Sequence, residues 1–144
     1  MDRGKSVEEL VIGETASFAK TISEYDVYAF AGITGDLNPV HIDRVAAEAS
    51  PFGKRVAHGM LTASLLSTVL GARLPGPGTI YLSQTLKFLK PVFIGDTVTA
   101  TVEVAELVPA KNRVRLATRC TNERGDVVAE GESWVMAPKA ETVR

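Results

Sequence analysis

The chain has 144 residues, 45% of them hydrophobic and 23% charged, with a formal net charge of −1. These values predict one globular domain, 1–144, and exclude a disordered chain. The absence of a Lys or Arg block argues against nucleic-acid binding, and the most apolar stretch, 56–74, is too interrupted for a membrane span. The charged N-terminus has no signal-peptide core, and the single cysteine, Cys120, excludes an internal disulfide, so we expect a cytoplasmic protein.

The first part of the chain predicts helices. Ser23 and Asp26 have the spacing of a capping box, and apolar residues follow at helical spacing. Gly32 and Gly35 are expected to end this helix. A second, short helix is predicted over about 43–49.

A longer helix is predicted from about Gly59 to Arg73. Its apolar residues almost encircle the helix, with only small and hydroxyl residues between them. A helix of this kind is expected to be buried on almost every side and to run through the middle of the molecule. The sequence Pro75-Gly76-Pro77-Gly78 ends it.

The second half of the chain alternates apolar and polar residues with a period of two. This pattern predicts strands over about 80–88, 97–104 and 113–120, and a further strand after a hairpin turn at 122–126. Three or four long antiparallel strands that follow one buried helix define an α+β fold. The simplest packing wraps the sheet around that helix.

Reactive side chains concentrate in one segment, 35–41. Pro39 disfavours helix at the residue before it, so the segment is expected to be an ordered loop. Such a loop would aim the Asp36 carboxylate and the His41 imidazole at a common point, as a general acid–base pair. The alternative is a purely structural turn, because Asp and Asn side chains also bind nearby backbone N–H groups.

Several residues of the long helix are candidates for a supporting role. Gly59 would expose the free N–H of a helix start to a bound carbonyl oxygen, or would only let two backbones pack closely. His58 is expected to cap the helix or to support the site rather than react. Ser67 either bonds back to a carbonyl four residues earlier or lines a pocket, and Leu70 belongs to the core or floors an acyl tunnel.

Other kinds of site find no support in the sequence. No spacing of His, Asp and Glu predicts a metal site. No glycine-rich phosphate loop and no Gly-x-Ser-x-Gly nucleophile elbow occurs.

Four segments resemble a known family in order along the chain. The sequence Gly35-Asp36-Leu37-Asn38-Pro39-Val40-His41-Ile42-Asp43 resembles the hydratase 2 motif of MaoC-like, R-specific enoyl-CoA hydratases, and segments 56–61, 75–82 and 88–96 continue the likeness. The resemblance is strongest to the short hydratases that supply R-3-hydroxyacyl-CoA for polyhydroxyalkanoate synthesis.

The resemblance implies a hot-dog fold and a homodimer whose two sheets join edge to edge, with each active site near the interface. It implies that Asp36 and His41 are the catalytic pair and that Asn38 supports them. It also implies that Gly59 donates its backbone N–H to the thioester carbonyl, and that Ser67 helps to hold the loop or pocket. No metal and no cofactor is expected.

The expected reaction is reversible R-specific hydration of a trans-2-enoyl-CoA, a step of fatty acid or polyhydroxyalkanoate metabolism. Asp36 and His41 would hold one water against C3 and return a proton to C2. Three alternatives remain open at this point: an acyl-CoA thioesterase, a dehydratase acting on 3-hydroxyacyl-carrier protein, and a non-catalytic acyl-CoA-binding protein.

Overall fold

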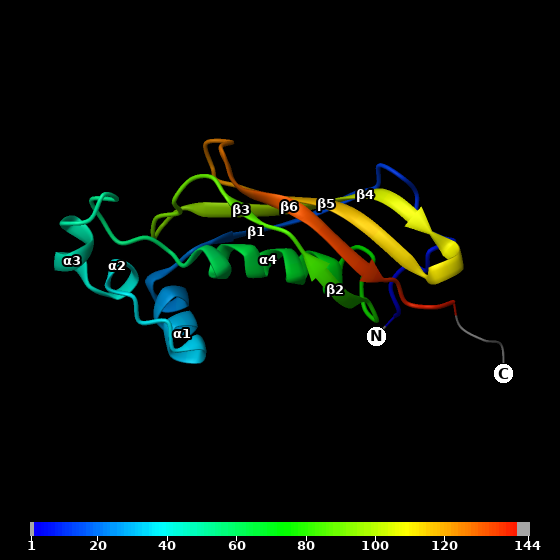
Figure 1. Ribbon diagram of the computed structural model, residues 1–144, viewed down its shortest axis with the longest axis horizontal. Coiled ribbons are helices and arrows are strands. Elements are labelled where there is room, and N and C mark those ends of the chain that lie inside the picture. Colours follow the sequence, from blue (N-terminus) through cyan, green and yellow to red (C-terminus); the bar gives the residue numbers. More distant parts are fainter. Residues whose placement is uncertain (1, 141–144) are drawn as a thin grey trace.

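The computed structural model describes residues 2–140 (Figure 1). In chain order the elements are β1 (Thr15–Thr21), α1 (Glu24–Thr34), α2 (Pro39–Ile42), α3 (Arg44–Glu48), α4 (Gly59–Ala72), β2 (Ile80–Gln84), β3 (Lys87–Phe88), β4 (Thr97–Val108), the 3-10 turn η1 (Pro109–Lys111), β5 (Arg113–Thr121) and β6 (Val127–Met136). Position 1 and positions 141–144 of the predicted domain lie outside the described residues.

The strands form one antiparallel sheet in the order β1-β4-β5-β6-β2, with β3 also paired to β6. The sheet extends along α4, while α1, α2 and α3 gather at the end where α4 begins (Figure 1). A sheet laid along one long helix is the predicted hot-dog arrangement, and the α+β prediction is confirmed. No helix among residues 2–140 is at once long enough and apolar enough to cross a membrane.

The two central strands, β4 and β5, confirm the predicted alternation. Their inward side chains are almost completely buried, and they belong to the same core as the inward face of α4. The hairpin after β5 is also confirmed, because Gly125 adopts the positive φ of 83° that this turn needs. The buried inward residues of these strands are Val98, Ala100, Val102, Val104, Val114, Leu116, Thr118 and Cys120.

The sequence prediction was wrong about the edges of the sheet. Strand β1 was not predicted, and the expected strand over 80–88 is divided into β2 and β3. The backbone of Thr85 passes very close to Gly131. A Cβ added at Gly131 would lie 1.8 Å from the Thr85 carbonyl oxygen. Pairing with β6 therefore breaks at this crossing, and the register shifts within β2.

The expected burial of α4 on almost every side is also wrong for the single chain. Residues such as Leu66 and Val69 are buried against the sheet, but one stripe of the helix is exposed. The sheet covers only one side of α4, so the opposite side has no cover within the chain. This stripe consists of Met60, Ser64, Ser67, Thr68 and Gly71.

Cys120 lies in the core, fully buried on β5. Burial raises the pKa of its thiol from 9.0 to about 11. In the unfolded chain the thiol ionises at the lower value. Its contribution to stability is therefore complete below the unfolded pKa and is lost as the pH rises through the folded pKa.

A comparison of the wild type with Cys120→Ala tests this pH dependence. We expect the free energy of unfolding of the wild type, relative to the variant, to fall by about 2–3 kcal/mol between about pH 8 and about pH 12. Denaturant unfolding of both proteins measures this difference. The other groups that titrate at alkaline pH are the same in both proteins, so their contributions to the free energy of unfolding cancel. A difference that stays constant over this range would contradict the assignment.

Candidate active site

Helix α1 determines where Asp36 lies. Ser23 and Asp26 form the predicted capping box at its start, with both reciprocal hydrogen bonds present. The helix continues through Gly32 and ends before Gly35, whose φ of 79° turns the chain out of the helix. Asp36 follows directly, and its backbone N–H donates to the Thr34 hydroxyl at 3.1 Å.

His41 is carried by a helix rather than by the predicted loop. Asn38 is the N-cap of α2 and its side chain accepts from the backbone N–H of Val40, while Pro39 occupies the first helical position. Proline is favoured there because its fixed φ suits a helix and it lacks an N–H that would have no partner. The supporting role predicted for Asn38 therefore has a physical basis, because it starts the one helical turn that contains His41.

The His41 ring is buried, with 9% exposed, and is fixed by segment 55–58. Its Nδ1 lies 2.8 Å from the carbonyl oxygen of Val56, and its own carbonyl accepts from Arg55 Nε at 2.7 Å. Because a carbonyl oxygen only accepts, the neutral ring carries its proton on Nδ1. The lone pair of Nε2 is then free to accept a proton.

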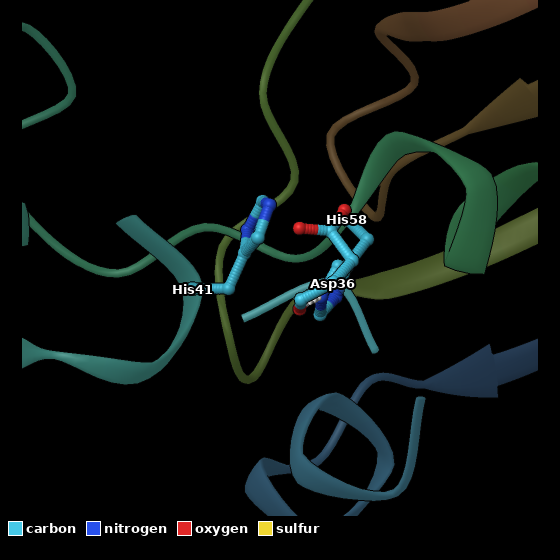
Figure 2. A group of neighbouring side chains, drawn as sticks. All are labelled: Asp36, His41 and His58. Atoms are coloured by element: carbon cyan, nitrogen blue, oxygen red, sulfur yellow. Dashed lines mark hydrogen bonds between the residues drawn. The ribbon is translucent and has the colours of Figure 1, made fainter. Parts of the chain in front are cut away.

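His58 brings the two predicted catalytic residues together (Figure 2). Its Nε2 lies 3.0 Å from the backbone oxygen of Asp36, and its ring stacks on that of His41 at 3.8 Å between centroids. The nitrogen or oxygen atoms that the three side chains offer lie within 4.8 Å of one another. The predicted meeting of the Asp36 carboxylate with the His41 ring is therefore present in the structure.

The same three residues have the composition of a metal site, which their spacing in the sequence did not predict. The two imidazoles, however, are stacked with 27° between their planes. Ring lone pairs lie in the ring plane, so those of stacked rings run side by side instead of converging on one ion. The geometry suits proton transfer better than tetrahedral metal coordination.

Gly59 is the first residue of α4, so its N–H has no acceptor within the helix. Within residues 2–140 no other backbone carbonyl accepts from it. A Cβ at this position would lie 2.8 Å from the Phe88 ring. The absence of a side chain therefore lets Phe88 approach the helix start, and the N–H stays available for a ligand.

These groups line one cavity of about 560 Å³, a size typical of small-molecule sites. Asp36, His41, His58 and Gly59 form its polar part. The remaining wall is mostly apolar, which suits an acyl chain. Its other lining residues are Asn38, Val40, Phe52, Val56, Ala57, Met60, Thr62, Phe88, Leu89, Lys90, Pro91, Val92, Val128 and Ala129.

Two predicted supporting residues do not reach this cavity in the single chain. Ser67 lies on the exposed stripe of α4, and its eight-residue separation from Gly59 corresponds to about 12 Å along a helix. The bond back to a helix carbonyl is made by Ser64 instead, to Leu61. Leu70 is 1% exposed and belongs to the core.

Several cavity residues were not predicted. Thr62 is buried, and its hydroxyl has no hydrogen-bond partner among residues 2–140. Phe88, Val128 and Ala129 come from β3 and β6. Nothing in the local sequence marks them, because only the pairing of β3 with β6 and the packing of the sheet on α4 bring them to Gly59.

An antiparallel sheet along one long helix is the architecture of a hot-dog protein, and here a carboxylate and an imidazole lie together at the helix start. The family model described as MaoC like domain matches residues 9–126, and the chain belongs to this family.

Individual relatives agree with this assignment. A protein from Rhodospirillum rubrum named (R)-specific enoyl-CoA hydratase is 56% identical over 131 residues, which cover 91% of this chain and 90% of the relative. A 3-hydroxybutyryl-CoA dehydratase from Methylorubrum extorquens is 55% identical over 93% of this chain and 85% of the relative. The solved (R)-hydratase from A. caviae, involved in PHA biosynthesis, superposes with a TM-score of 0.89 at 43% identity, covering 91% of this chain and 99% of that one.

Proposed function

We propose that this protein is an (R)-specific enoyl-CoA hydratase that adds water reversibly to trans-2-enoyl-CoA and forms (R)-3-hydroxyacyl-CoA. The observation that carries the proposal is the convergence of Asp36 and His41 in one cavity with the free N–H of Gly59. The relatives named (R)-specific enoyl-CoA hydratase and 3-hydroxybutyryl-CoA dehydratase support the same reaction in its two directions.

The pair would act by orienting one water molecule. An ionised Asp36 carboxylate and the Nε2 of neutral His41 are both acceptors, so each takes one hydrogen of the water. The oxygen lone pair of that water then points away from both groups, toward C3 of the substrate. One group of the pair removes a proton as the C3–O bond forms, and the pair returns a proton to C2 on the same face.

Gly59 would stabilise the charge that this addition creates. As the water attacks C3, the electrons of the double bond move toward the thioester oxygen and give an enolate. The Gly59 N–H, at the positive end of the α4 dipole, is placed to bind that oxygen. The conjugated thioester already makes C3 electrophilic, so the proposed reaction requires no metal and no redox cofactor.

The exposed apolar surface supports a homodimer. Strand β2 is an edge of the sheet, yet it exposes Ile80, Tyr81 and Leu82, and the apolar side chains of Phe88 and Leu89 are also half exposed. Edge strands of this kind pair with another chain unless they are protected. Since Phe88 and Leu89 also line the cavity, a second copy paired along β2 would lie next to the active site.

A substitution on β2 tests the dimer. We expect Leu82→Lys to convert the wild-type dimer into a monomer in light scattering after size exclusion, because a charge would be placed in the apolar contact. Val11→Lys is the matched control, since Val11 is at least as exposed but lies just before β1, at the opposite edge of the sheet from β2. A monomeric wild type, or a Leu82→Lys variant that remains dimeric, would contradict the proposed interface.

The proposed substrate is a CoA thioester of fatty acid or polyhydroxyalkanoate metabolism, and the proposed location is the cytoplasm. The (R)-hydratase from A. caviae, which is involved in PHA biosynthesis, supports this metabolic setting.

The decisive experiment uses purified protein and a chain-length series of enoyl-CoA substrates beginning with crotonyl-CoA. Loss of the conjugated thioester absorbance measures hydration, and chiral chromatography of the product is expected to give the R enantiomer. Free thiol is assayed in the same reactions. Release of CoA without hydration would favour a thioesterase, and binding without turnover would favour an acyl-CoA-binding protein. Turnover restricted to carrier-protein thioesters would favour a dehydratase of that class.

A further inference from the structure

His58 is the most buried titratable group of the site, with 2% of the residue exposed. Its ring is enclosed by two aromatic neighbours, since His41 stacks on it at 3.8 Å and Phe30 contacts it at 4.9 Å between ring centroids. Its side chain makes no capping bond to α4. The capping role considered from the sequence is therefore wrong, and the ring is directed at the catalytic pair instead.

The hydrogen bond of His58 defines its tautomer. The backbone oxygen of Asp36 only accepts, so the proton of the neutral ring lies on Nε2. Nδ1 is buried and has no hydrogen-bond partner among the described residues. In this tautomer Nδ1 carries no proton, so its lack of a partner leaves no buried N–H donor without an acceptor.

This contact is unusual within the segment that carries Asp36. The other hydrogen bonds of residues 35–38 connect residues no more than four positions apart, for example from Asn38 N–H to the Asp36 carboxylate and from Gly35 N–H to the Ala31 carbonyl. Among residues 2–140, only His58 binds this exposed segment to a distant part of the chain. A single N–H group thus connects the Asp36 backbone, which α1 places here, to the start of α4.

We infer that His58 is a positioning residue for the reaction proposed above: its Nε2–H fixes the backbone of Asp36, while its ring face fixes the plane of the His41 imidazole. Because His58 directly precedes Gly59, it also connects the acid–base pair to the proposed carbonyl-binding N–H through a single peptide bond. Rates of proton transfer depend on such positions, and a misplacement of about 1 Å can cost about 10²-fold in rate.

Two substitutions separate the functions of the ring and of the N–H. His58→Phe keeps a planar ring for the stack but has no donor, whereas His58→Gln keeps an amide N–H that can reach the Asp36 carbonyl. With crotonyl-CoA we expect kcat of His58→Phe to fall about 10²-fold with KM nearly unchanged, and kcat of His58→Gln to stay within about tenfold of the wild type. Val69→Ala, a buried truncation on the sheet side of α4, is the control for lost stability.

A double variant distinguishes positioning from a general structural effect. If His58 acts through Asp36, then His58→Phe should lower kcat little further once Asp36 is Asn.

Should His58→Phe not fold, His58→Asn is used, because its shorter amide cannot reach the Asp36 carbonyl. The inference is overturned if the variant that lacks the donor has the kcat of the wild type. It is also overturned if the variant loses no more kcat than Val69→Ala does at equal melting temperature. Either result would leave the proposed reaction intact. A wild-type protein that does not hydrate crotonyl-CoA or longer enoyl-CoAs would overturn both.

Discussion

Replacing Asp36 by Asn is expected to lower kcat for hydration of crotonyl-CoA by about 10²–10⁴-fold or more. The amide preserves the size of the side chain and one acceptor oxygen, so the Asn38 N–H can still bind it. It cannot accept a proton from the bound water. We expect KM to change little, because the apolar wall and the Gly59 N–H remain. Steady-state kinetics from the loss of enoyl-thioester absorbance measure both constants.

The control for Asp36→Asn is Glu48→Gln, which removes one negative charge from α3 outside the cavity. Its carboxylate pairs with Arg44 on the surface, and such exposed pairs contribute little stability. We expect wild-type kcat for this control. Near-normal hydration by folded Asp36→Asn would exclude the carboxylate from the chemistry.

Replacing His41 by Gln is expected to cause a loss of similar size, about 10²–10⁴-fold in kcat. The Gln amide nitrogen takes the position of Nε2 rather than that of Nδ1, and an amide nitrogen donates hydrogen bonds but has no lone pair that accepts a proton. Because both residues hold the same water molecule, the two losses should not multiply. The double variant Asp36→Asn/His41→Gln should have a kcat within about tenfold of the poorer single variant.

The double-variant cycle is measured on proteins with matched melting temperatures, because His41 is buried and stacked on His58. Losses that multiply across the cycle would mean that the two residues act in independent steps. In that case a single shared water would not describe the mechanism.

The site depends on short signals that the sequence shows clearly. Ser23 with Asp26 starts α1, Gly35 ends it, and Asp36 comes next, so the place of the proposed catalytic carboxylate follows from a cap and a turn within one segment. His41 was predicted in a loop and lies in a helical turn. The rule that disfavours helix before a proline applied correctly to Asn38, but the same proline favours a helix that begins at its own position.

Errors of the prediction concern contacts between distant segments. The pattern over 80–88 alternates as in a strand, yet the crossing of Thr85 over Gly131 divides it. The apolar and small residues around α4 indicated burial on almost every side, but the chain supplies one sheet and leaves the stripe with Ser67 exposed. The composition of a helix shows that its surface is suited to burial, but it does not show which partner covers that surface.

The sequence by itself determined the starts of α1, α3 and α4, the strand period, the residues of the proposed acid–base pair and the glycine at the start of α4. These features are local, because they depend on dihedral preferences, caps and side-chain spacing within a few residues. The tertiary structure alone decided that His58 contacts both Asp36 and His41, and that β3 and β6 complete the cavity. Those contacts join segments that are distant in the chain, and they form only when the apolar faces of α4 and the sheet pack together to leave water.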